Sequence, residues 1–508
     1  MAGTLIVDSL HAAVRAHARS KPEETAIVES EGAIRMSWAG LWNAANAVAD
    51  EWSSRGVERG ARVVTILPPD ANFAVALVAA SVSGVCLVPM DLRFREADLC
   101  SVLQDVRIDA VVGITEFEGF EGLRAVADLC AVPGERTFDA SQGPFWNAAT
   151  RAGSADRFEG EPDDPLLIVF TGGSTGRPKG AVLTQQQITA ACRIEYAAIG
   201  EHFERAETGE TFVLSALPTS HVGGAAEIVA GSLIDGLSLV CLTEWHPVEA
   251  MKAQAKWRMP VIAGVPAMYA ILTEMDLSEF DLSALQVAVC SGDRFSGALA
   301  AKVRDKLCPS ILVSYGMTEA NVLTLTAPDV GGDALDAGYV GRTLPGVEIR
   351  VGADDELVVR GPQVIERYLS DPETSASFTE DGWFRTGDQG RVEDGHVWVT
   401  GRLKQIIRVG SYTVLPHEVE AVALTFPDVA TCAAVANPDE RLGETVALFV
   451  QAATDERIDE AALRAHLAER LADFKRPRLI EFREALPRTR ADKIDRGQLA
   501  SELKGAVA

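Results

Sequence analysis

The sequence lacks the features that mark nucleic-acid-binding, secreted and membrane-spanning proteins. Among its 508 residues, Asp and Glu outnumber Lys and Arg by 73 to 47, which gives a net charge of −26. Phosphate backbones and anionic membranes are bound by basic surfaces, so this balance disfavours both as partners. The first residues show no basic segment followed by a long apolar one, so no secretory leader is expected. The apolar run 74–90 is broken by Ser81, Gly84 and Pro89, which predicts a helix and a strand instead of a membrane span.

Paired cysteines are also absent. The eight cysteines form no Cys-x-x-Cys pair, and several lie in apolar runs, as Cys86 does. Buried reduced thiols are therefore expected in preference to disulfides or a zinc site, and with them a cytoplasmic location.

The order of apolar segments predicts an α/β fold. A chain of 508 residues exceeds one simple core, so two or more domains are expected. Helical windows alternate with short Val/Ile/Leu runs, which is typical of parallel-type sheets with crossover helices. We expect helices at 10–18, 38–54, 72–83 and 460–471, and strands at 62–67, 86–88, 165–170, 181–183, 211–216, 238–242, 261–264, 287–290, 311–315, 347–351, 356–360, 396–400, 433–436 and 445–451.

The pattern changes after Gly346, where short alternating strands are separated by Gly- and Asp-rich segments. This predicts a small β subdomain at about 345–400 within a large N-terminal domain, residues 1–402. Residues 403–508 are predicted to form a small, mobile α+β domain.

The most informative segment is the loop 170–180, Phe-Thr-Gly-Gly-Ser-Thr-Gly-Arg-Pro-Lys-Gly. Its glycines let backbone N–H groups approach phosphate oxygens, its hydroxyl groups add donors, and Lys179 adds charge. A Walker A loop would end in Gly-Lys-Ser/Thr and begin a helix. Here the order is Pro178-Lys179-Gly180 and a strand-like run follows, so the loop is not a P-loop. Taken alone, it could also be an ordinary flexible loop.

Two further segments carry polar groups at strand ends. Ser314–Ala320 follows an apolar strand, and Glu319 at its end suits Mg²⁺ ligation. In 381–388, Asp388 lies beside a glycine turn and suits two hydrogen bonds from a ribose diol. Each segment alone is equally compatible with a structural turn.

Together, in this order, the segments resemble the AMP-forming adenylating superfamily of acyl-CoA synthetases, luciferases and nonribosomal-peptide adenylation domains, and most of all its acyl- or aryl-CoA ligases. The resemblance covers almost the whole chain and implies ATP, Mg²⁺ and CoA, or a carrier-protein phosphopantetheine, as reactants and cofactors. It implies that Tyr315 stacks on adenine, Thr318 contacts the α-phosphate, Asp388 and Arg402 bind ribose, and Lys493 is the catalytic lysine of the small domain. The nucleotide-binding residues implied are Thr171, Gly172, Gly173, Ser174, Thr175, Gly176, Lys179, Tyr315, Gly316, Asp388 and Arg402, with Glu319 and Thr175 at the metal.

The resemblance also places the acid and the thiol. His221 would lie near the acyl carboxylate, although a packed histidine at a helix start is the alternative. The hinge would be at Lys404 and the thiol tunnel at Gly410 and Ser411. The implied acyl pocket consists of His221, Val222, Gly223, Gly292, Asp293 and Met317.

Several residues depart from the family pattern. Ser411 replaces a usual glycine in the thiol tunnel, and Asp492 replaces the glycine before Lys493. Val222 stands near the position where α-amino-acid-activating domains place an Asp, which disfavours α-amino acids. Asp293-Arg294 is charged where many members are small or prolyl, so either a turn ion pair or a polar or aromatic acid substrate is possible.

The positions of the basic residues agree with a reaction that brings negative charges together. Carboxylate attack on a phosphate gathers negative charge, which Lys179, Lys493 and Mg²⁺ on Glu319 would offset. The segment 475–496 has eight basic residues against four acidic ones, which fits CoA phosphates or an acidic carrier protein, or else a balanced surface.

We therefore expect ATP-dependent activation of an aryl or medium-chain carboxylic acid to acyl-AMP, followed by transfer to CoA. The alternatives are a stand-alone enzyme that loads a carrier-protein thiol or another nucleophile, and a non-catalytic acyl-nucleotide-binding paralogue. The identity of the acid and the oligomeric state are not encoded in any of these motifs.

Overall fold

The computed structural model describes residues 9–505 except for 31, 33, 142–159, 172–177, 207–208, 404–406, 410–411, 440–441, 454–457, 472 and 490–492. It consists of two compact units. Unit 1 comprises Met1–Gly331, Gly341–Glu348 and Val359–Phe384, and unit 2 comprises Gly332–Val340, Ile349–Val358 and Arg385–Ala508. The predicted boundary at 402/403 and the hinge at Lys404 stay predictions, and Lys404 lies outside the described residues.

The largest sheet of unit 1 has seven strands in the order β18-β8-β7-β4-β3-β5-β6. Its bounds are β3 (Arg62–Ile66), β4 (Cys86–Pro89), β5 (Ala110–Gly113), β6 (Thr137–Asp139), β7 (Pro165–Thr171), β8 (Lys179–Thr184) and β18 (Arg367–Tyr368). Strands β7, β4, β3, β5 and β6 are mutually parallel, as predicted. Strands β8 and β18 are antiparallel to their neighbours, so the sheet is mixed. The antiparallel pairing was not predicted because buried strands of either direction are continuous apolar runs.

Two further sets of strands complete the sheets of unit 1. One is the sheet β2-β1-β10-β9, and the other is the run β11-β12-β13-β14, which is parallel except for its last pair. Their bounds are β1 (Thr25–Glu29), β2 (Arg35–Ser37), β9 (Phe212–Ser215), β10 (Ser238–Cys241), β11 (Val261–Gly264), β12 (Val287–Cys290), β13 (Ser310–Met317) and β14 (Asn321–Leu325).

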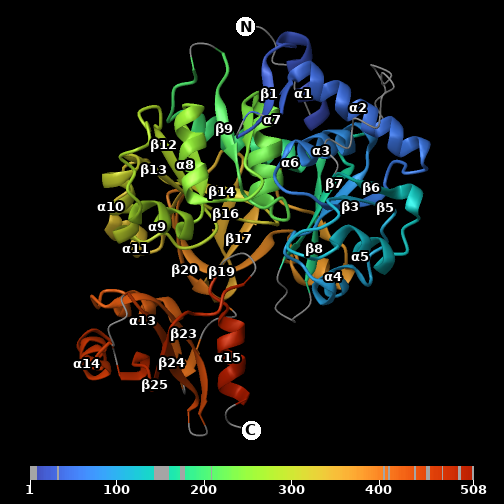
Figure 1. Cartoon of the computed structure of the whole chain (residues 1–508). Coiled ribbons are helices and arrows are strands. Elements are labelled where there is room, and N and C mark those ends of the chain that lie inside the picture. The colour runs from blue at the N-terminus through green and yellow to red at the C-terminus, as the bar shows by residue number, and fades with distance from the viewer. Residues whose placement is uncertain are drawn as a thin grey trace. The chain divides into compact units, whose positions relative to one another are not determined.

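The helices of unit 1 cover these sheets, and α1, α2 and α3 pack on one another near the start of the chain (Figure 1). Every residue of α3 is buried, which explains the apolar run that continues into β4. Asp70 caps the beginning of α3 through the backbone N–H of Phe73, and Gly84 ends it with a φ of 69°. The helices are α1 (Leu10–Ser20), α2 (Trp38–Ser54), α3 (Ala71–Ser83), α4 (Glu96–Leu103), α5 (Gly122–Leu129), α6 (Gln185–Gly200), the π-helix η3 (Gly223–Ala230), α7 (Gly231–Asp235), α8 (Pro247–Lys256), α9 (Pro266–Glu274), α10 (Gly297–Lys306) and α12 (Asp371–Ala376).

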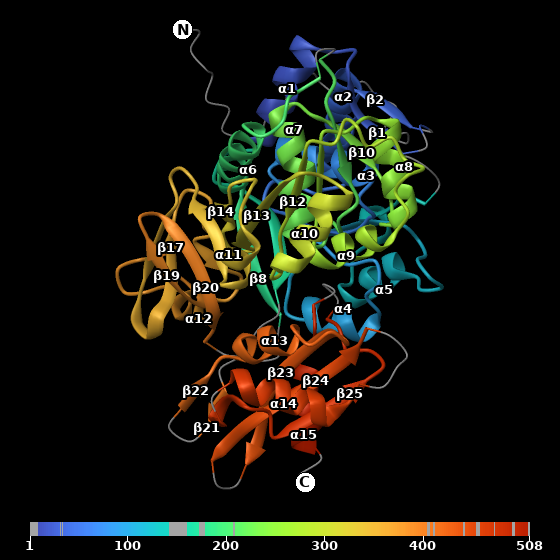
Figure 2. The same cartoon turned by 90° about the vertical axis from the view of Figure 1, so that its left-hand side faces the viewer.

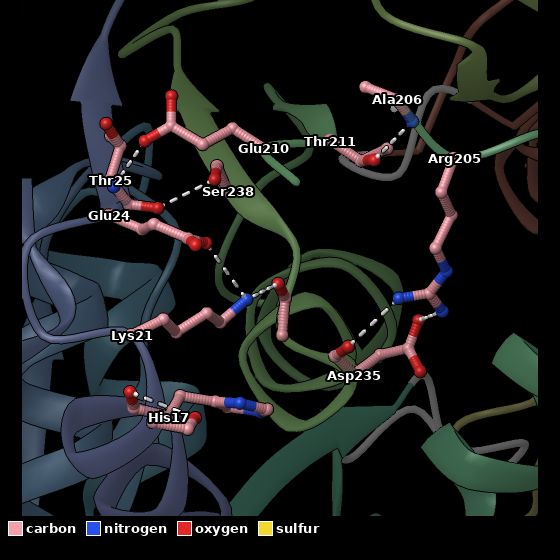
Figure 3. Close-up of polar contacts among 12 residues, drawn as sticks. His17, Lys21, Glu24, Thr25, Arg205, Ala206, Glu210, Thr211, Asp235 and Ser238 are labelled. Carbon is pink, nitrogen blue, oxygen red and sulfur yellow. Dashed lines mark hydrogen bonds and ion pairs between the residues drawn. The ribbon is translucent and has the colours of Figure 1, made fainter. Parts of the chain in front are cut away.

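A polar network joins the end of α1 and the start of β1 to the segments that precede β9 and β10 (Figure 3). Lys21 Nζ donates to the carbonyl oxygen of Gly236 at 2.6 Å. The Thr25 N–H donates to Glu210 Oε1 at 2.8 Å, and Ser238 Oγ donates to the Thr25 carbonyl oxygen at 2.7 Å. These bonds join segments more than 180 residues apart, and burial lowers the pKa of Lys21. The network therefore stabilises the start of the chain without a disulfide.

His11 on α1 makes stability depend on pH. It is buried, its Nδ1 lies 3.0 Å from Ser81 Oγ, and burial lowers its pKa to about 4. Above pH 6.5 the imidazole is neutral in both folded and unfolded chains. As the pH falls from 6.5 toward 4, only the unfolded chain gains the proton, so stability is lost over that window, by up to about 3 kcal/mol.

Urea denaturation at several pH values checks this prediction. The free energy of unfolding of the wild type should fall more steeply between pH 6.5 and pH 4 than that of His11→Gln. His202→Gln, which removes a histidine outside this network, should keep the wild-type slope. Equal slopes for wild type and His11→Gln would contradict the assignment.

Unit 2 contains a sheet with helices on both faces, and successive side chains along its strands point into two different apolar clusters. In β23 (Val429–Asp439), Cys432 and Ala434 pack in one cluster, while Ala433 and Val435 pack in the other. Helices α13 (Pro416–Ala423) and α14 (Glu460–Arg470) cover the first cluster, and α15 (Arg496–Gly505) covers the second (Figure 2). This period of two is what a sheet with helices on both faces requires. The other strands of the sheet are β21 (Ile407–Val409), β22 (Tyr412–Val414), β24 (Gly443–Ala452) and β25 (Leu479–Arg483).

The remaining strands form the run β15-β20-β19-β17-β16, and the predicted β subdomain at about 345–400 stays a prediction. Strands β19 and β20 pair antiparallel, and Asp388 is opposite Arg402 in their register. Strand β15 (Tyr339–Thr343) crosses from one unit to the other along the chain. The bounds are α11 (Gly332–Asp336), β16 (Glu348–Val351), β17 (Glu356–Arg360), β19 (Phe384–Glu393) and β20 (His396–Arg402).

All eight cysteines are free thiols, six of them buried and two, Cys100 and Cys130, half-buried. No helix among the described residues is long and apolar enough to cross a bilayer.

Candidate active site

The first element of the site in unit 1 is the hairpin formed by β7 and β8. Thr171 ends β7, Lys179 begins β8, and the two residues are opposite each other in the antiparallel register. A strand, not a helix, therefore follows the loop, as its Pro-Lys-Gly order predicted. The loop residues Gly172, Gly173, Ser174, Thr175 and Gly176 lie outside the described residues.

The second element is the turn from β13 to β14, which carries Tyr315 to Glu319. A Cβ on Gly316 would lie 2.1 Å from the carbonyl oxygen of Asn321, so only glycine allows the two strands to approach this closely. Asn321 begins β14 with a φ of 50°. The tight turn presents Thr318 and Glu319 at the end of β13.

The structure brings Glu319 together with Thr171 and Lys179, and it adds Tyr368. Tyr368 donates a 2.7 Å hydrogen bond to Glu319 Oε1, and Thr171 donates one of 3.2 Å to the same oxygen. Lys179 Nζ lies 5.3 Å from the centroid of the Tyr368 ring. Burial raises the pKa of Tyr368, and the neighbouring Glu319 raises it further, so the phenol remains a donor.

Sequence reasoning did not find Tyr368. It lies in the two-residue strand β18, which pairs with β8, and only that pairing brings it near Lys179 and Glu319. A single aromatic residue in a polar segment gives no local signal of this contact.

Glu319 also passes a test for holding Mg²⁺. Among the described residues both hydrogen bonds to its carboxylate end on Oε1, so Oε2 has no protein donor there. No group of three His, Cys, Asp or Glu side chains gathers anywhere in the described part of the chain. Mg²⁺ is commonly held by one or two carboxylates together with substrate phosphates, which fits a single glutamate beside a phosphate loop.

In unit 2, Asp388 and Arg402 form an ion pair on adjacent strands. Arg402 Nε lies 2.7 Å from Asp388 Oδ1, and Asp388 is only 1% exposed while the Arg402 side chain is 57% exposed. The Asp388 N–H donates to Thr386 Oγ1 at 3.0 Å. The two residues predicted to bind ribose are therefore adjacent, with the carboxylate held in place by its cation.

His221 lies immediately before the π-helix η3 and is half-buried. Its neighbour Ser220 donates a long hydrogen bond of 3.4 Å to Asp91 Oδ2, and Asp91 also pairs with Arg93 at 2.8 Å. Burial opposes ionisation of Asp91, but the hydrogen bonds and charge of Arg93, with His221 nearby, hold the pKa of this carboxyl below its usual value. Asp91 thus remains an anion close to the predicted carboxylate end of the acyl site.

The other predicted acyl-pocket residues are distributed over three elements of unit 1. Val222 is buried, and Gly223 is half-buried at the start of η3. Gly292 follows β12 with a φ of 89°, and Asp293 is exposed, where its carboxylate accepts from the Arg294 N–H at 2.8 Å. Met317 ends β13. Their roles in acid binding stay predictions.

Lys493 is exposed in unit 2, in a turn closed by the Thr489 N–H, which donates to the Lys493 carbonyl oxygen at 2.6 Å. The thiol-tunnel residues Gly410 and Ser411 and the neighbouring Asp492 lie outside the described residues.

Several basic side chains of the segment 475–496 have carboxylate partners. Lys475 pairs with Glu418 at 2.8 Å, and Arg496 pairs with Glu420 at 2.8 Å. Arg483 pairs with Glu481 and Glu502. For part of the segment 475–496, these ion pairs favour the alternative in which its basic residues are balanced by carboxylates of the same surface.

Comparison with known families places the chain among the adenylate-forming enzymes. The chain belongs to the family of AMP-binding enzymes: that family matches residues 14–369, and the C-terminal domain of AMP-binding enzymes matches residues 418–493. It is 32% identical to a methyl-dioxo-octahydroindenyl-propanoyl:CoA ligase of Mycobacterium tuberculosis over 95% of this chain and 96% of that one. It is 30% identical to a feruloyl-CoA synthase of an Amycolatopsis species, with the same coverage of both chains.

Solved structures agree with this assignment. ATP-bound MatB from Rhodopseudomonas palustris superimposes with a TM-score of 0.88 at 25% identity, covering 99% of this chain and all of the other. The o-succinylbenzoate CoA synthetase MenE of Bacillus subtilis has the same fold, with a TM-score of 0.82 at 22% identity over 96% of this chain and 97% of the other. The predicted family and the α/β fold class are confirmed, as is the class of enzyme, an AMP-forming acid–thiol ligase.

Proposed function

We propose that this protein activates an aryl or medium-chain carboxylic acid with ATP and transfers the acyl group to the thiol of CoA. In the first step the carboxylate oxygen bonds to the α-phosphorus, and the bond from that phosphorus to the bridging oxygen breaks, releasing pyrophosphate. In the second step the thiol sulfur bonds to the acyl carbon, AMP leaves, and the thiol proton passes to solvent. The observation that supports this most directly is the convergence of Glu319 and Tyr368 with Thr171 and Lys179, the two residues nearest the loop 172–177 in β7 and β8.

Each residue has a proposed part in the first step. Glu319, with Thr175, would hold Mg²⁺, which when bound offsets negative charge on the phosphates. Lys179 and Lys493 would supply further positive charge, and both act as cations without proton transfer. Thr318 would contact the α-phosphate, and His221 would lie near the acyl carboxylate.

The remaining roles concern binding and the second step. Tyr315 and Gly316 would contact adenine, and Asp388 with Arg402 would bind ribose. The hinge at Lys404 would let the small domain exchange Lys493 for the thiol tunnel at Gly410 and Ser411. A carrier-protein thiol remains an alternative acceptor. A cytoplasmic location is also proposed, supported by eight cysteines without a disulfide partner.

Acid-dependent ATP–pyrophosphate exchange across a library of carboxylic acids tests this function. Exchange with a subset of acids is expected, and CoA or a phosphopantetheinylated carrier protein, added separately, then identifies the acceptor. Folded protein that binds ATP and exchanges with no acid would contradict the proposal and favour a nucleotide-binding paralogue.

A further inference from the structure

Few residues are accessible in the segment that contains the π-helix after His221. Between residues 221 and 230 three residues are half-buried, namely His221, Gly223 and Glu227, and all the others are buried. Glu227 Oε2 lies 3.6 Å from the position that a Cβ on Gly223 would occupy, so this carboxylate lies over the glycine. π-Helical turns are rare and concentrate at functional sites. The half-buried residues of this segment therefore include the predicted contact to the acyl carboxylate, His221, and a glutamate with no role assigned so far, Glu227.

A second glutamate lies behind the first. Glu195 on α6 is only 7% exposed, and its Oε2 has no hydrogen-bond partner among the described residues. Burial raises the pKa of Glu195, and the neighbouring Glu227 raises it further; burial raises the pKa of Glu227 to about 7. In the part of the chain that the structure describes, no Lys, Arg or His forms an ion pair with either carboxyl.

The two helices that carry these glutamates are fixed to each other. The hydroxyl group of Tyr196 donates to the carbonyl oxygen of Glu227 at 2.8 Å, and Cys192 Sγ lies 3.4 Å from the carbonyl oxygen of Ala226. Glu227 is thus held on a rigid element and not on a loop. A buried and a half-buried carboxyl group side by side without a cation cost free energy, which favours a ligand that supplies the missing donor.

We infer that Glu227 accepts a hydrogen bond from a donor, a hydroxyl group or a protonated amine, at the end of the acid substrate remote from its reacting carboxyl. This inference rests on the proposed function, because it assumes that His221 marks the carboxylate end of the acyl site. Six residues separate His221 from Glu227, a rise of at most about 9 Å along a helix axis. One aromatic ring or a short aliphatic chain spans that length, so the acid is of the aryl or medium-chain class.

The pairing also determines which acids are disfavoured. A site built to bind a donor rejects a substrate that lacks the donor far more strongly than an apolar pocket rejects a substrate that lacks one methylene group. Acids with an apolar tail of equal size are therefore poor substrates. Burial and the neighbouring Glu227 both raise the pKa of Glu195 and favour its protonated form, so Glu195 adds no second negative charge behind Glu227.

Exchange kinetics with matched acids test the inference. The pairs are 4-hydroxybenzoate or 4-(aminomethyl)benzoate against 4-methylbenzoate, and 6-hydroxyhexanoate or 6-aminohexanoate against heptanoate. In the wild type, kcat/KM should favour the donor-bearing acids by about tenfold or more. Glu227→Leu should lose about 100-fold with those acids and gain with the apolar ones. Glu227→Gln keeps an acceptor but removes the negative charge. If the natural donor is a hydroxyl group, kcat/KM should therefore fall less for the hydroxy acids than for the amino acids.

Two controls separate this inference from the proposed function. Glu201→Gln changes an exposed glutamate at the end of the same helix α6 and should leave every preference unchanged. Calorimetric binding of unreactive acyl-sulfamoyl adenosines, with and without the distal donor, measures preference without turnover. Exchange without any donor preference would overturn the inference and leave the proposed function intact. Donor-selective binding without exchange would support the inference and overturn the function, and no binding of either analogue by folded protein would overturn both.

Discussion

Replacement of Lys493 by alanine should lower acid-dependent ATP–pyrophosphate exchange by about 10²–10³-fold, the usual effect of removing one donor that faces developing negative charge. The lysine side chain is exposed in unit 2, on a turn closed by the backbone of Thr489. It therefore makes little contribution to folding, and its loss should act on the reaction. Thioester formation from a preformed acyl-adenylate should keep nearly its wild-type rate, because the lysine is proposed to act only in the first step. Separate assays of the two half-reactions measure both effects.

Two further variants make the Lys493 result specific. Lys493→Arg keeps the positive charge and should retain part of the exchange activity, although the planar guanidinium group presents its donors differently. Lys302→Ala removes an exposed lysine of unit 1 that pairs with Glu274, and it should behave as wild type. If Lys493→Ala slowed both half-reactions equally, this would contradict the proposal that the lysine acts only in the first step.

The sequence predicted the elements with strong apolar runs very closely. The helix Trp38–Ser54 and the strands Val261–Gly264 and Val287–Cys290 have the predicted bounds. The antiparallel hairpins β7–β8 and β13–β14 were not predicted, because strand direction depends on hydrogen bonding between strands and leaves no mark on a buried apolar run. Several helices were also missed, among them α4 and α5 with eight residues each and α6 with 16.

The candidate site shows the same division between local and non-local information. Linear motifs located Thr171, Glu319 and Asp388, because glycines and hydroxyl groups beside a charged residue mark a turn that binds phosphate or ribose. Tyr368 is 49 residues from Glu319, and strand β9 separates Glu195 from Glu227 along the chain. The sequence analysis singled out neither glutamate, because no motif surrounds them. Only packing of α6 on the π-helix brings them together away from water.

Glu319→Gln should reduce exchange activity by at least about 100-fold, because it removes the one carboxylate at this turn that could ligate Mg²⁺ beside the phosphate loop. Glutamine has nearly the same shape and still accepts hydrogen bonds, so Thr171 and Tyr368 can keep their contacts and the fold should be unchanged. The measurement is the exchange rate at increasing Mg²⁺, together with Mg²⁺-dependent ATP binding by calorimetry. Loss of both at ordinary Mg²⁺, with an unchanged melting temperature, is the expected result.

Tyr368→Phe is the matched control for the same carboxylate. It removes the 2.7 Å hydrogen bond to Glu319 but keeps the aromatic ring beside Lys179 and the charge of Glu319 itself. If the phenol orients the carboxylate, the Mg²⁺ concentration for half-maximal exchange should rise by about tenfold with little change in kcat, because one charge-assisted hydrogen bond is lost. Saturating Mg²⁺ should then rescue Tyr368→Phe but not Glu319→Gln. An unchanged Mg²⁺ requirement in Tyr368→Phe would mean that Glu319 is positioned by its own backbone turn, where its carbonyl oxygen accepts from the Ile365 N–H at 2.8 Å.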